Sequence, residues 1–259
     1  MPLITLTTDL GTRDHYAAAV KGELLKSLKN ATIVDISHDI TPFDIMHGSF
    51  VLKNSYHHFP PGTYHLIGVN LNSEEGMSHL VVMKEQHIFI GPDNGIFGLL
   101  WDGEMPQEIF QLQPSKEESA GTLPMLDLYV RSVKHLSEGG NPGDIGVKVA
   151  SFRQSTMGRP IISTDYIRAS IIYFDRFENA VVNIRKAEFE SIQKNRKYVL
   201  YFKRYDDIDI IHDNYFHVPE SEKVCLFNSS GYLEIAINKG NAMGLLNLNV
   251  GDIVQIEFK

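Results

Sequence analysis

The sequence predicts an α/β N-terminal domain with a largely parallel sheet, followed by a small all-β, barrel-like C-terminal domain. Three observations support this fold class. Over residues 1–150, short β-type apolar runs alternate with segments of helical periodicity. Beyond about residue 158, short strand-like runs follow one another closely, which is typical of a barrel or a sandwich. The length of 259 residues is sufficient for two domains that each bury a core.

The N-terminal domain is expected to span residues 1–150. The apolar patterns predict strands at 3–8, 32–36, 64–69, 79–83 and 87–90 and helices at 14–28 and 44–55. A further helix is expected at 124–136, with Thr122 as its cap and Pro124 in its first turn. In such sheets ligands bind beyond the carboxyl ends of the strands, where we expect Asp9 and the turn at 92–94.

The C-terminal domain is expected over residues 163–259, after a linker at 151–162. Its strand-like runs occupy 167–174, 180–184, 198–202, 224–227, 233–237 and 253–258. Only residues 187–193 and a turn near Ala242 have helical character. Short strands at this spacing predict an all-β domain.

Composition and charge exclude several classes of protein. Lys and Arg total 24 and Asp and Glu total 32, so the net charge is −8, which argues against a nucleic-acid partner. No apolar run approaches the ~20 residues of a membrane helix, and the first residues lack the basic stretch of a signal peptide. The single cysteine, Cys225, cannot form an intramolecular disulfide, so we expect a cytoplasmic protein.

The sequence also lacks the common catalytic and metal signatures. It contains no GxxxxGK, GxGxxG, GxSxG or HExxH pattern. His57 and His58 are adjacent, so they do not face one pocket on a helix, and no cysteine or carboxylate lies at ligand spacing. We therefore expect no bound metal.

Three polar segments are candidates for a ligand site. In residues 8–14, the Asp9 carboxylate is an acceptor-only group that matches a ribose cis-diol, although a helix cap with Gly11 in the turn is the alternative. In residues 175–184, Asn179 can pair with an adenine edge and Phe177 can stack on a base, although a plain hairpin turn is the alternative. In residues 228–242, hydroxyls and main-chain amides around Gly231 could hold a carboxylate, although a polar turn is the alternative.

These segments occur in order, together with residues 33–45 and 91–95. The set resembles the S-adenosyl-L-methionine hydroxide adenosyltransferase family, which is related to the fluorinases and chlorinases, and the resemblance covers nearly the whole chain. It implies an α/β domain followed by a β-barrel domain. It also implies a nucleoside ligand, no cofactor other than S-adenosylmethionine as substrate or ligand, and a homotrimer. The ligand would lie between the N-terminal domain of one subunit and the C-terminal domain of its neighbour.

The resemblance implies roles for the matched residues. Asp9 would grip the ribose diol, and Phe43 stands where the family places an aromatic residue near the sugar. Phe177 would stack on adenine and Asn179 would hydrogen-bond to it, with Asp175 close by.

The remaining matched residues lie toward the end of the chain. Ser229 and Ser230 lie where the family holds the carboxylate and amine of methionine, and the backbone near Asn238 and Lys239 would meet the adenine edge. The halogenases carry arginine at the position of Ser230, so the resemblance implies weaker anchoring of the amino-acid end here.

The sequence departs from the family at the catalytic positions. The family's reaction is attack of water or hydroxide on the ribose C5′ of S-adenosylmethionine, with methionine leaving as a neutral thioether. The hydrolases use an Asp, Arg and His set, and the matched positions here hold Asn70, Met77 and Pro124. Because none of these side chains can supply a charge or a titrating proton, the resemblance leaves the catalytic residues unknown.

Three hypotheses follow from this departure. The first is an enzyme that still cleaves S-adenosylmethionine and uses other groups, such as Glu74, Glu75, His79 or Asp127. The second is a protein that binds S-adenosylmethionine or adenosine without turnover. The third is a trimeric relative that binds neither. A halogenase is not expected, because the small polar loop that would hold the halide is not recognisable.

Overall fold

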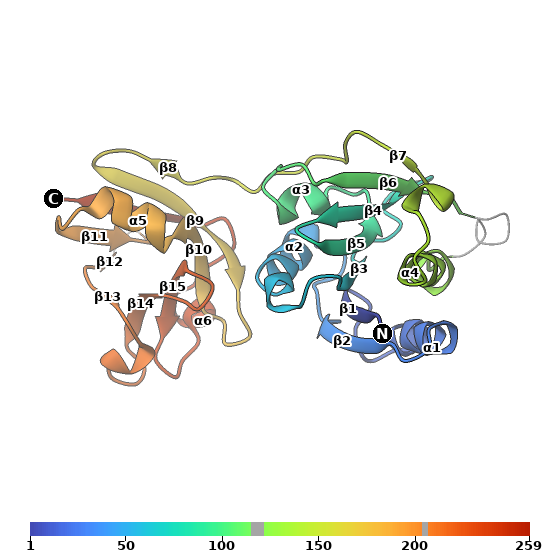
Figure 1. Ribbon diagram of the computed structural model, residues 1–259. Coiled ribbons are helices and arrows are strands. Elements are labelled where there is room, and N and C mark those ends of the chain that lie inside the picture. Colours follow the sequence, from blue (N-terminus) through green and yellow to red (C-terminus); the bar gives the residue numbers. More distant parts are fainter. Residues whose placement is uncertain (115–121, 204–206) are drawn as a thin grey trace. The chain divides into compact units, whose positions relative to one another are not determined.

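The computed structural model describes residues 1–114, 122–203 and 207–259 (Figure 1). It divides into two compact units, Met1–Met157 and Gly158–Lys259. The first unit contains a mixed sheet covered by helices, and the second is built almost entirely of strands. This arrangement confirms the predicted fold class.

The sheet of the first unit has seven strands in the order β2-β1-β3-β5-β4-β6-β7. Its strands are β1 (Leu3–Thr8), β2 (Thr32–Ser37), β3 (Tyr64–Gly68), β4 (His79–Lys84), β5 (His87–Pro92), β6 (Glu108–Leu112) and β7 (Gly146–Lys148). The pairs β1–β2, β1–β3 and β3–β5 are parallel, and the pairs from β5 through β4 and β6 to β7 are antiparallel. The sheet is therefore mixed, with its parallel part at the β2 side.

A two-residue hairpin explains the change of direction between β4 and β5. Glu85 and Gln86 connect these strands, and both have positive φ, 54° and 66°. Two consecutive left-handed residues form the tight turn whose twist matches an antiparallel pair. The apolar runs predicted both strands, but only this turn geometry sets their relative direction.

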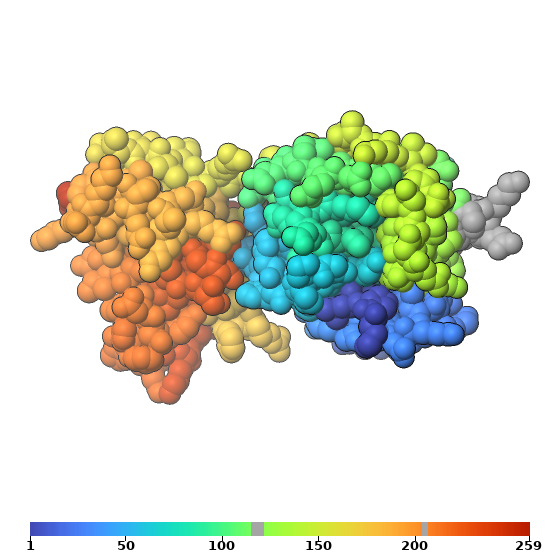
Figure 2. Space-filling view, in the orientation of Figure 1, coloured from blue at the N-terminus to red at the C-terminus, as the bar shows by residue number. Residues whose placement is uncertain are grey.

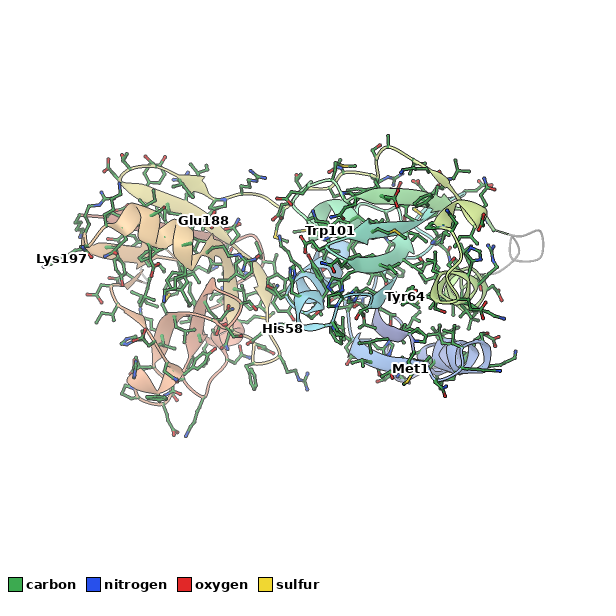
Figure 3. The ribbon with its side chains drawn as sticks, in the orientation of Figure 1. Met1, His58, Tyr64, Trp101, Glu188 and Lys197 are labelled. Atoms are coloured by element: carbon green, nitrogen blue, oxygen red, sulfur yellow. The ribbon has the colours of Figure 1, made fainter. Side chains whose placement is uncertain are left out.

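The helices of the first unit cover both faces of the sheet. They are α1 (Tyr16–Ser27), α2 (Ile45–Lys53), α3 (Ile96–Leu100) and α4 (Val130–Ser137), with short 3-10 turns at Tyr56–His58 and Pro142–Asp144. Apolar residues of α1 and α4 pack on one side of the sheet, and those of α2 and α3 pack on the other. Tyr64 and Trp101, labelled in Figure 3, belong to these two separate cores. Figure 2 shows the yellow-green segment that includes α4 at the surface of this unit.

The helix expected at 124–136 begins differently from the prediction. Its first turn is a π-helix at Met125–Tyr129, in which the Tyr129 N–H donates to the Pro124 carbonyl at 3.1 Å. The residue at the cap position is Pro124, so the prediction that Thr122 caps this helix is wrong. The Thr122 carbonyl instead accepts a hydrogen bond from the Asn72 side chain at 2.7 Å, which ties it to another loop.

The second unit is a barrel-like sheet in the order β12-β11-β16-β9-β10-β15-β14-β13, with β8 paired to β9. The strands are β8 (Ile161–Ile162), β9 (Tyr166–Phe174), β10 (Ala180–Arg185), β11 (Tyr198–Tyr201), β12 (Asp207–Ile208), β13 (Ile211–His212), β14 (Lys223–Phe227), β15 (Tyr232–Ile237) and β16 (Ile253–Phe258). Two helices, α5 (Lys186–Gln193) and α6 (Ala242–Leu245), and a 3-10 turn at Tyr215–His217 complete it.

Period-two alternation places the core of this second unit. In β9 the buried residues are Ile167, Ala169 and Ile171, and their neighbours along the strand are more exposed. Cys225 on β14 is fully buried in the same core, and burial raises the pKa of its thiol. The thiol is therefore a small apolar filler of the core.

Candidate functional site

Asp9 joins three loops at the carboxyl edge of the parallel strands. One carboxylate oxygen, Oδ2, accepts hydrogen bonds from the main-chain N–H of Phe43 at 2.9 Å and of Asn70 at 3.0 Å. The Asp9 N–H in turn donates to the Gly68 carbonyl at 3.1 Å. No described residue donates to the second oxygen, Oδ1. This half-occupied carboxylate is the group that the sequence assigned to a ribose diol.

The alternative interpretation of Asp9 as a helix cap is wrong. Helix α1 begins at Tyr16, and the residue at its cap position is His15. The turn at Gly11 does form, with φ of +67°, and its N–H donates to the His38 carbonyl at 2.8 Å. Asp9 therefore holds loops from other strands and does not start the helix that follows it.

Both residues that donate to Asp9 have unusual backbones. Phe43 has φ of 68° and Asn70 has φ of 50°, in the left-handed region that non-glycine residues seldom adopt. The hydrogen bonds to a charged acceptor offset part of this strain. The Phe43 side chain is 73% exposed, so its ring is available at the surface beside Asp9.

Asn94 is a site residue to which sequence reasoning gave no role. Its side-chain amide donates to the carbonyls of Val69 at 3.0 Å and Asn70 at 3.1 Å. Its Oδ1 accepts from the Ile96 N–H at 3.2 Å, at the start of α3. The side chain is buried and fixes the loop that carries Asn70. The signal for it was the turn at 92–94, which lies at a strand end.

The loop at 70–78 carries Asn70 and Met77, two of the three positions at which the sequence departs from the family's catalytic set, and it contacts the segment before the third, Pro124. Asn70 directly follows β3 after Val69, and the Met77 N–H donates to the Glu74 carbonyl at 3.3 Å in a turn before β4. The hydrogen bond from Asn72 to Thr122 ties this loop to the segment that precedes Pro124. None of the three side chains at Asn70, Met77 and Pro124 carries a charge.

The four alternative groups differ in what surrounds them. His79 is 7% exposed, and its Nδ1 lies 2.8 Å from the buried Tyr129 hydroxyl. Burial lowers the pKa of His79 to about 4, so the ring is neutral at pH 7. Asp127 and Glu75 are exposed. Glu74 forms an ion pair with Arg153, at 2.6 Å between Oε1 and Nη2. Glu74 is therefore both accessible and held in place.

Arg153 is a second residue that sequence reasoning missed. Its main-chain N–H donates to Asp93 Oδ1 at 2.7 Å, directly after β5. The preceding Phe152 is buried in the core against α3, and a Cβ at Gly98 would lie 2.6 Å from the Ser155 nitrogen. The backbone around Arg153 is thus pressed against the start of α3. This packing places a guanidinium at the same sheet edge as Asp9.

In the second unit, Asp175 shapes the turn between β9 and β10. Its Oδ1 accepts from the N–H of Phe177 at 2.9 Å and of Asn179 at 2.8 Å, and its Oδ2 accepts from the Asn179 side chain at 3.1 Å. Asn179 is buried, whereas Phe177 at the turn is 74% exposed. The segment is a hairpin turn that presents an aromatic ring, and its contact with adenine stays a prediction.

The side chain of Asn228 holds the turn that carries Ser229 and Ser230. Asn228 Oδ1 accepts from the main-chain N–H of Ser230 at 3.0 Å and of Tyr232 at 3.1 Å. The Asn228 amide donates to Glu234 Oε2, on β15, at 3.0 Å.

Glu234 is a buried carboxylate that the sequence did not single out. It is 2% exposed on β15, and the Tyr215 hydroxyl donates to its Oε1 at 2.7 Å. Burial raises its pKa, the hydrogen bonds from Tyr215 and Asn228 oppose that rise, and the charge of nearby Asp175 adds to it. Glu234 therefore links the turn at 228–231, through Asn228, with Tyr215.

Asn238 and Lys239 directly follow β15, near the Asp175 hairpin. The Asn238 amide donates to the Val218 carbonyl at 2.8 Å, and Lys239, with φ of 53°, forms an ion pair with Glu220. The next element, α6, contacts the hairpin through the Met243 N–H, which donates to the Glu178 carbonyl at 3.0 Å. In the second unit, Asn238 and Lys239 thus lie at the end of β15 that is close to the Asp175 hairpin, whereas the turn with Ser229 and Ser230 lies at the opposite end of β15, beside Arg185.

Within the described ranges, no three His, Cys, Asp or Glu side chains are placed to hold a metal ion. No helix in these same ranges is long and apolar enough to cross a membrane.

Comparisons with known proteins give matches to both units. Residues 4–146 match the SAM hydroxide adenosyltransferase N-terminal domain, and residues 169–255 match the C-terminal domain. A protein of Methanocaldococcus jannaschii named (R)-S-adenosyl-L-methionine hydrolase is 30% identical over 278 residues, covering 100% of this chain and 97% of the relative. A Thermus thermophilus protein of the same name is 26% identical, covering 96% of this chain and 97% of the relative.

A solved structure gives the same fold. The crystal structure of an uncharacterised conserved protein from Thermotoga maritima matches with a TM-score of 0.88 at 24% identity, over 98% of this chain and 99% of that one. The two domain matches and the full-length relatives together lead to one conclusion, that the chain belongs to the SAM hydroxide adenosyltransferase family.

Proposed function

We propose that this protein binds S-adenosyl-L-methionine and hydrolyses it to adenosine and methionine. The observation that carries the proposal is the Asp9 carboxylate, which is fixed by the Phe43 and Asn70 amides and has one oxygen without a donor among the described residues. A carboxylate held in this way can accept hydrogen bonds from both hydroxyls of a ribose diol. Family membership supplies the substrate class, because full-length relatives carry the name of this hydrolase.

In the proposed reaction, a water oxygen forms a bond to the ribose C5′ as the bond from C5′ to sulfur breaks. The electron pair of the broken bond goes to sulfur, which converts the sulfonium into the neutral thioether of methionine. The water proton must go to a base. Because the leaving group is already activated, the protein mainly has to position the water and exclude competing solvent.

We assign the proton-accepting role to Glu74. His79 is buried against Tyr129, whereas Glu74 is accessible and is oriented by the Arg153 guanidinium. Within this ion pair, Arg153 places a guanidinium next to the loop in which Met77 carries no charge. A carboxylate oriented by a fixed guanidinium can act as a general base.

The second candidate function is binding of S-adenosylmethionine or adenosine without turnover. The observation that favours it is the uncharged set of Asn70, Met77 and Pro124 at one end of the sheet. A protein of this kind would act as a sensor or a sequestering protein. A third outcome, in which neither ligand binds, would leave only the fold in common with the family.

We also propose a cytoplasmic homotrimer with its ligand sites at subunit interfaces and no cofactor beyond S-adenosylmethionine itself. Two exposed phenylalanines support this assembly, because Phe43 and Phe177 each present a bare ring beside a predicted ligand group. The lone, buried Cys225 supports a reducing compartment. Light scattering coupled to gel filtration should give three times the chain mass, and a monomer at micromolar concentration would contradict the trimer.

One experiment separates the three functions. The purified protein is incubated with S-adenosylmethionine beside a protein-free control, products are followed by chromatography, and binding is measured by calorimetry on the same preparation. Adenosine and methionine above the control support the hydrolase. Binding without adenosine supports the second candidate. Absence of both binding and turnover would overturn the assignment of S-adenosylmethionine as the ligand.

A further inference from the structure

Arg185, at the end of β10, lies against the turn that carries Ser229 and Ser230. Its guanidinium stacks on the Tyr232 ring, with Cζ 3.6 Å from the ring centroid. One nitrogen, Nη1, donates to the Ser230 carbonyl, and Nη2 donates to the Tyr232 hydroxyl at 2.7 Å. These contacts hold the guanidinium plane in a single orientation beside the turn.

Among the residues that the structure describes, the Arg185 guanidinium has no carboxylate partner. No carboxylate oxygen of a described residue lies within 4.0 Å of its guanidinium. The nearby Glu188 uses its carboxylate on the Arg185 main-chain N–H, at 2.8 Å. Two arginines with ordered contacts differ in this respect, since Arg153 pairs with Glu74 and Arg196 pairs with Asp165. A partly buried, oriented guanidinium without an anion is suited to take an anion from a ligand.

The turn beside Arg185 offers further donors. The side-chain hydroxyls of Ser229 and Ser230 make no hydrogen bond with any residue that the structure describes. Asn228 holds the turn in place through its bonds to Ser230 and Tyr232, and Gly231 has φ of +76°. This short turn therefore carries two hydroxyls without a partner among the described residues, and the guanidinium of Arg185 lies beside it. A carboxylate is the small anion whose two oxygens match such a set.

We propose that Arg185 binds the carboxylate of the amino-acid arm of the ligand and makes the protein prefer S-adenosylmethionine over nucleosides that lack this carboxylate. The proposal rests on the proposed function, because it takes the ligand from there and adds the residue that recognises one end of it. Arg185 provides from β10 the positive charge that Ser230 does not provide from the turn itself.

The test compares S-adenosylmethionine with its decarboxylated analogue, which keeps the sulfonium and the amine. Calorimetry with wild type should show tighter binding of S-adenosylmethionine. Arg185→Gln should weaken S-adenosylmethionine binding by about 10- to 100-fold, as expected for loss of a charged hydrogen bond, and leave the analogue within twofold. Arg185→Lys, which keeps the charge but not the planar fork, should fall between them. If the protein turns over, KM should rise while kcat is kept.

A matched control is available in Arg196. It also stacks on an aromatic ring, Phe258, and also donates to main-chain carbonyls, those of Thr164 and Ile192, but it already has a carboxylate partner. Arg196→Gln should leave both ligands unaffected.

The remaining outcomes are distinct. If Arg185→Gln retains the preference, or loses both ligands equally, this inference is wrong while the proposed function stands. If wild type binds both ligands equally, the inference is also wrong. If wild type binds neither ligand, the proposed function fails and this inference fails with it.

Discussion

The Asp9 carboxylate accepts a hydrogen bond from the main-chain N–H of Asn70, 61 residues later in the chain. This bond connects the ends of β1 and β3, which are neighbouring parallel strands. It also stabilises Asn70 in a left-handed conformation. The residue proposed to hold the sugar is thus the same residue that shapes the loop leading to Met77.

Asp9→Ala should weaken binding and destabilise the carboxyl edge. Loss of a charged acceptor should reduce adenosine affinity by about 2 to 4 kcal/mol, and loss of two hydrogen bonds should lower the free energy of unfolding by about 2 kcal/mol. Calorimetry and urea denaturation measure the two effects. Glu190→Ala, which removes an exposed ion pair with Lys186 on a helix, should change the free energy of unfolding by less than about 1 kcal/mol. Unchanged adenosine affinity in Asp9→Ala would rule out the ribose role.

Glu74→Gln should reduce kcat by about 100-fold or more with little change in KM, because it removes the base but keeps the shape of the side chain. Arg153→Met should lower kcat by a smaller factor, since it releases Glu74 without removing it. Glu75→Gln lies in the same loop and serves as the comparison. Steady-state kinetics with S-adenosylmethionine measure all three, and equal losses in Glu74→Gln and Glu75→Gln would argue for a general effect of loop charge.

His79 should make the protein sensitive to acid. Burial lowers its pKa to about 4 in the folded state, against about 6.5 in the unfolded chain, so the unfolded chain binds more protons between these values. The stability from neutral His79 is present above pH 6.5 and is lost as the pH falls toward 4, by about 3 kcal/mol over that window. Urea denaturation at pH 7 and pH 4.5 should show this loss.

The matched variant for that experiment is His79→Gln, which retains a hydrogen-bonding group near Tyr129 but does not titrate. Its free energy of unfolding should depend less on pH over the same window. An identical pH dependence in wild type and variant would assign the acid sensitivity to other groups, such as His65, whose pKa burial and His87 lower to about 3.

Gly68→Ala should destabilise the first unit. A Cβ at this position would lie 2.3 Å from the Met125 Sδ and 2.9 Å from the Thr8 Cγ2, so the new methyl group overlaps both neighbours. Overpacking of this kind costs about 1 to 3 kcal/mol. Gly22→Ala, in α1 with nothing within 4 Å of the new Cβ, should instead stabilise by up to about 1 kcal/mol. Thermal unfolding of both variants, and partial recovery in Gly68→Ala with Met125→Ala, would check the cause.

Local patterns in the sequence were sufficient for the fold class and for most elements. Alternation along residues 167–171 and 254–258 predicted the strands that build the barrel-like sheet, because a period of two places every second side chain in the core. The loop carrying Asp9 was also predictable, since a polar residue directly after a buried strand lies at the ligand edge of a parallel sheet. The family followed from motifs in order along the chain.

Other features depended on tertiary contacts. The hairpin at Glu85 and Gln86 makes the sheet mixed, and the π-helical turn after Pro124 replaces the cap expected at Thr122. Both depend on backbone geometry that no residue pattern in these segments specifies.

The sequence by itself determined which polar groups this protein has and which strand ends carry them. Only the tertiary structure decided which of those groups are paired. Arg153 meets Glu74 across 79 residues, and Arg185 meets Ser230 across 45. Hydrogen bonds and ion pairs between distant segments form only after the sheets have set the distance between them. Periodicity predicts on which face of a strand or helix a side chain lies, but it does not predict which distant residue that side chain contacts.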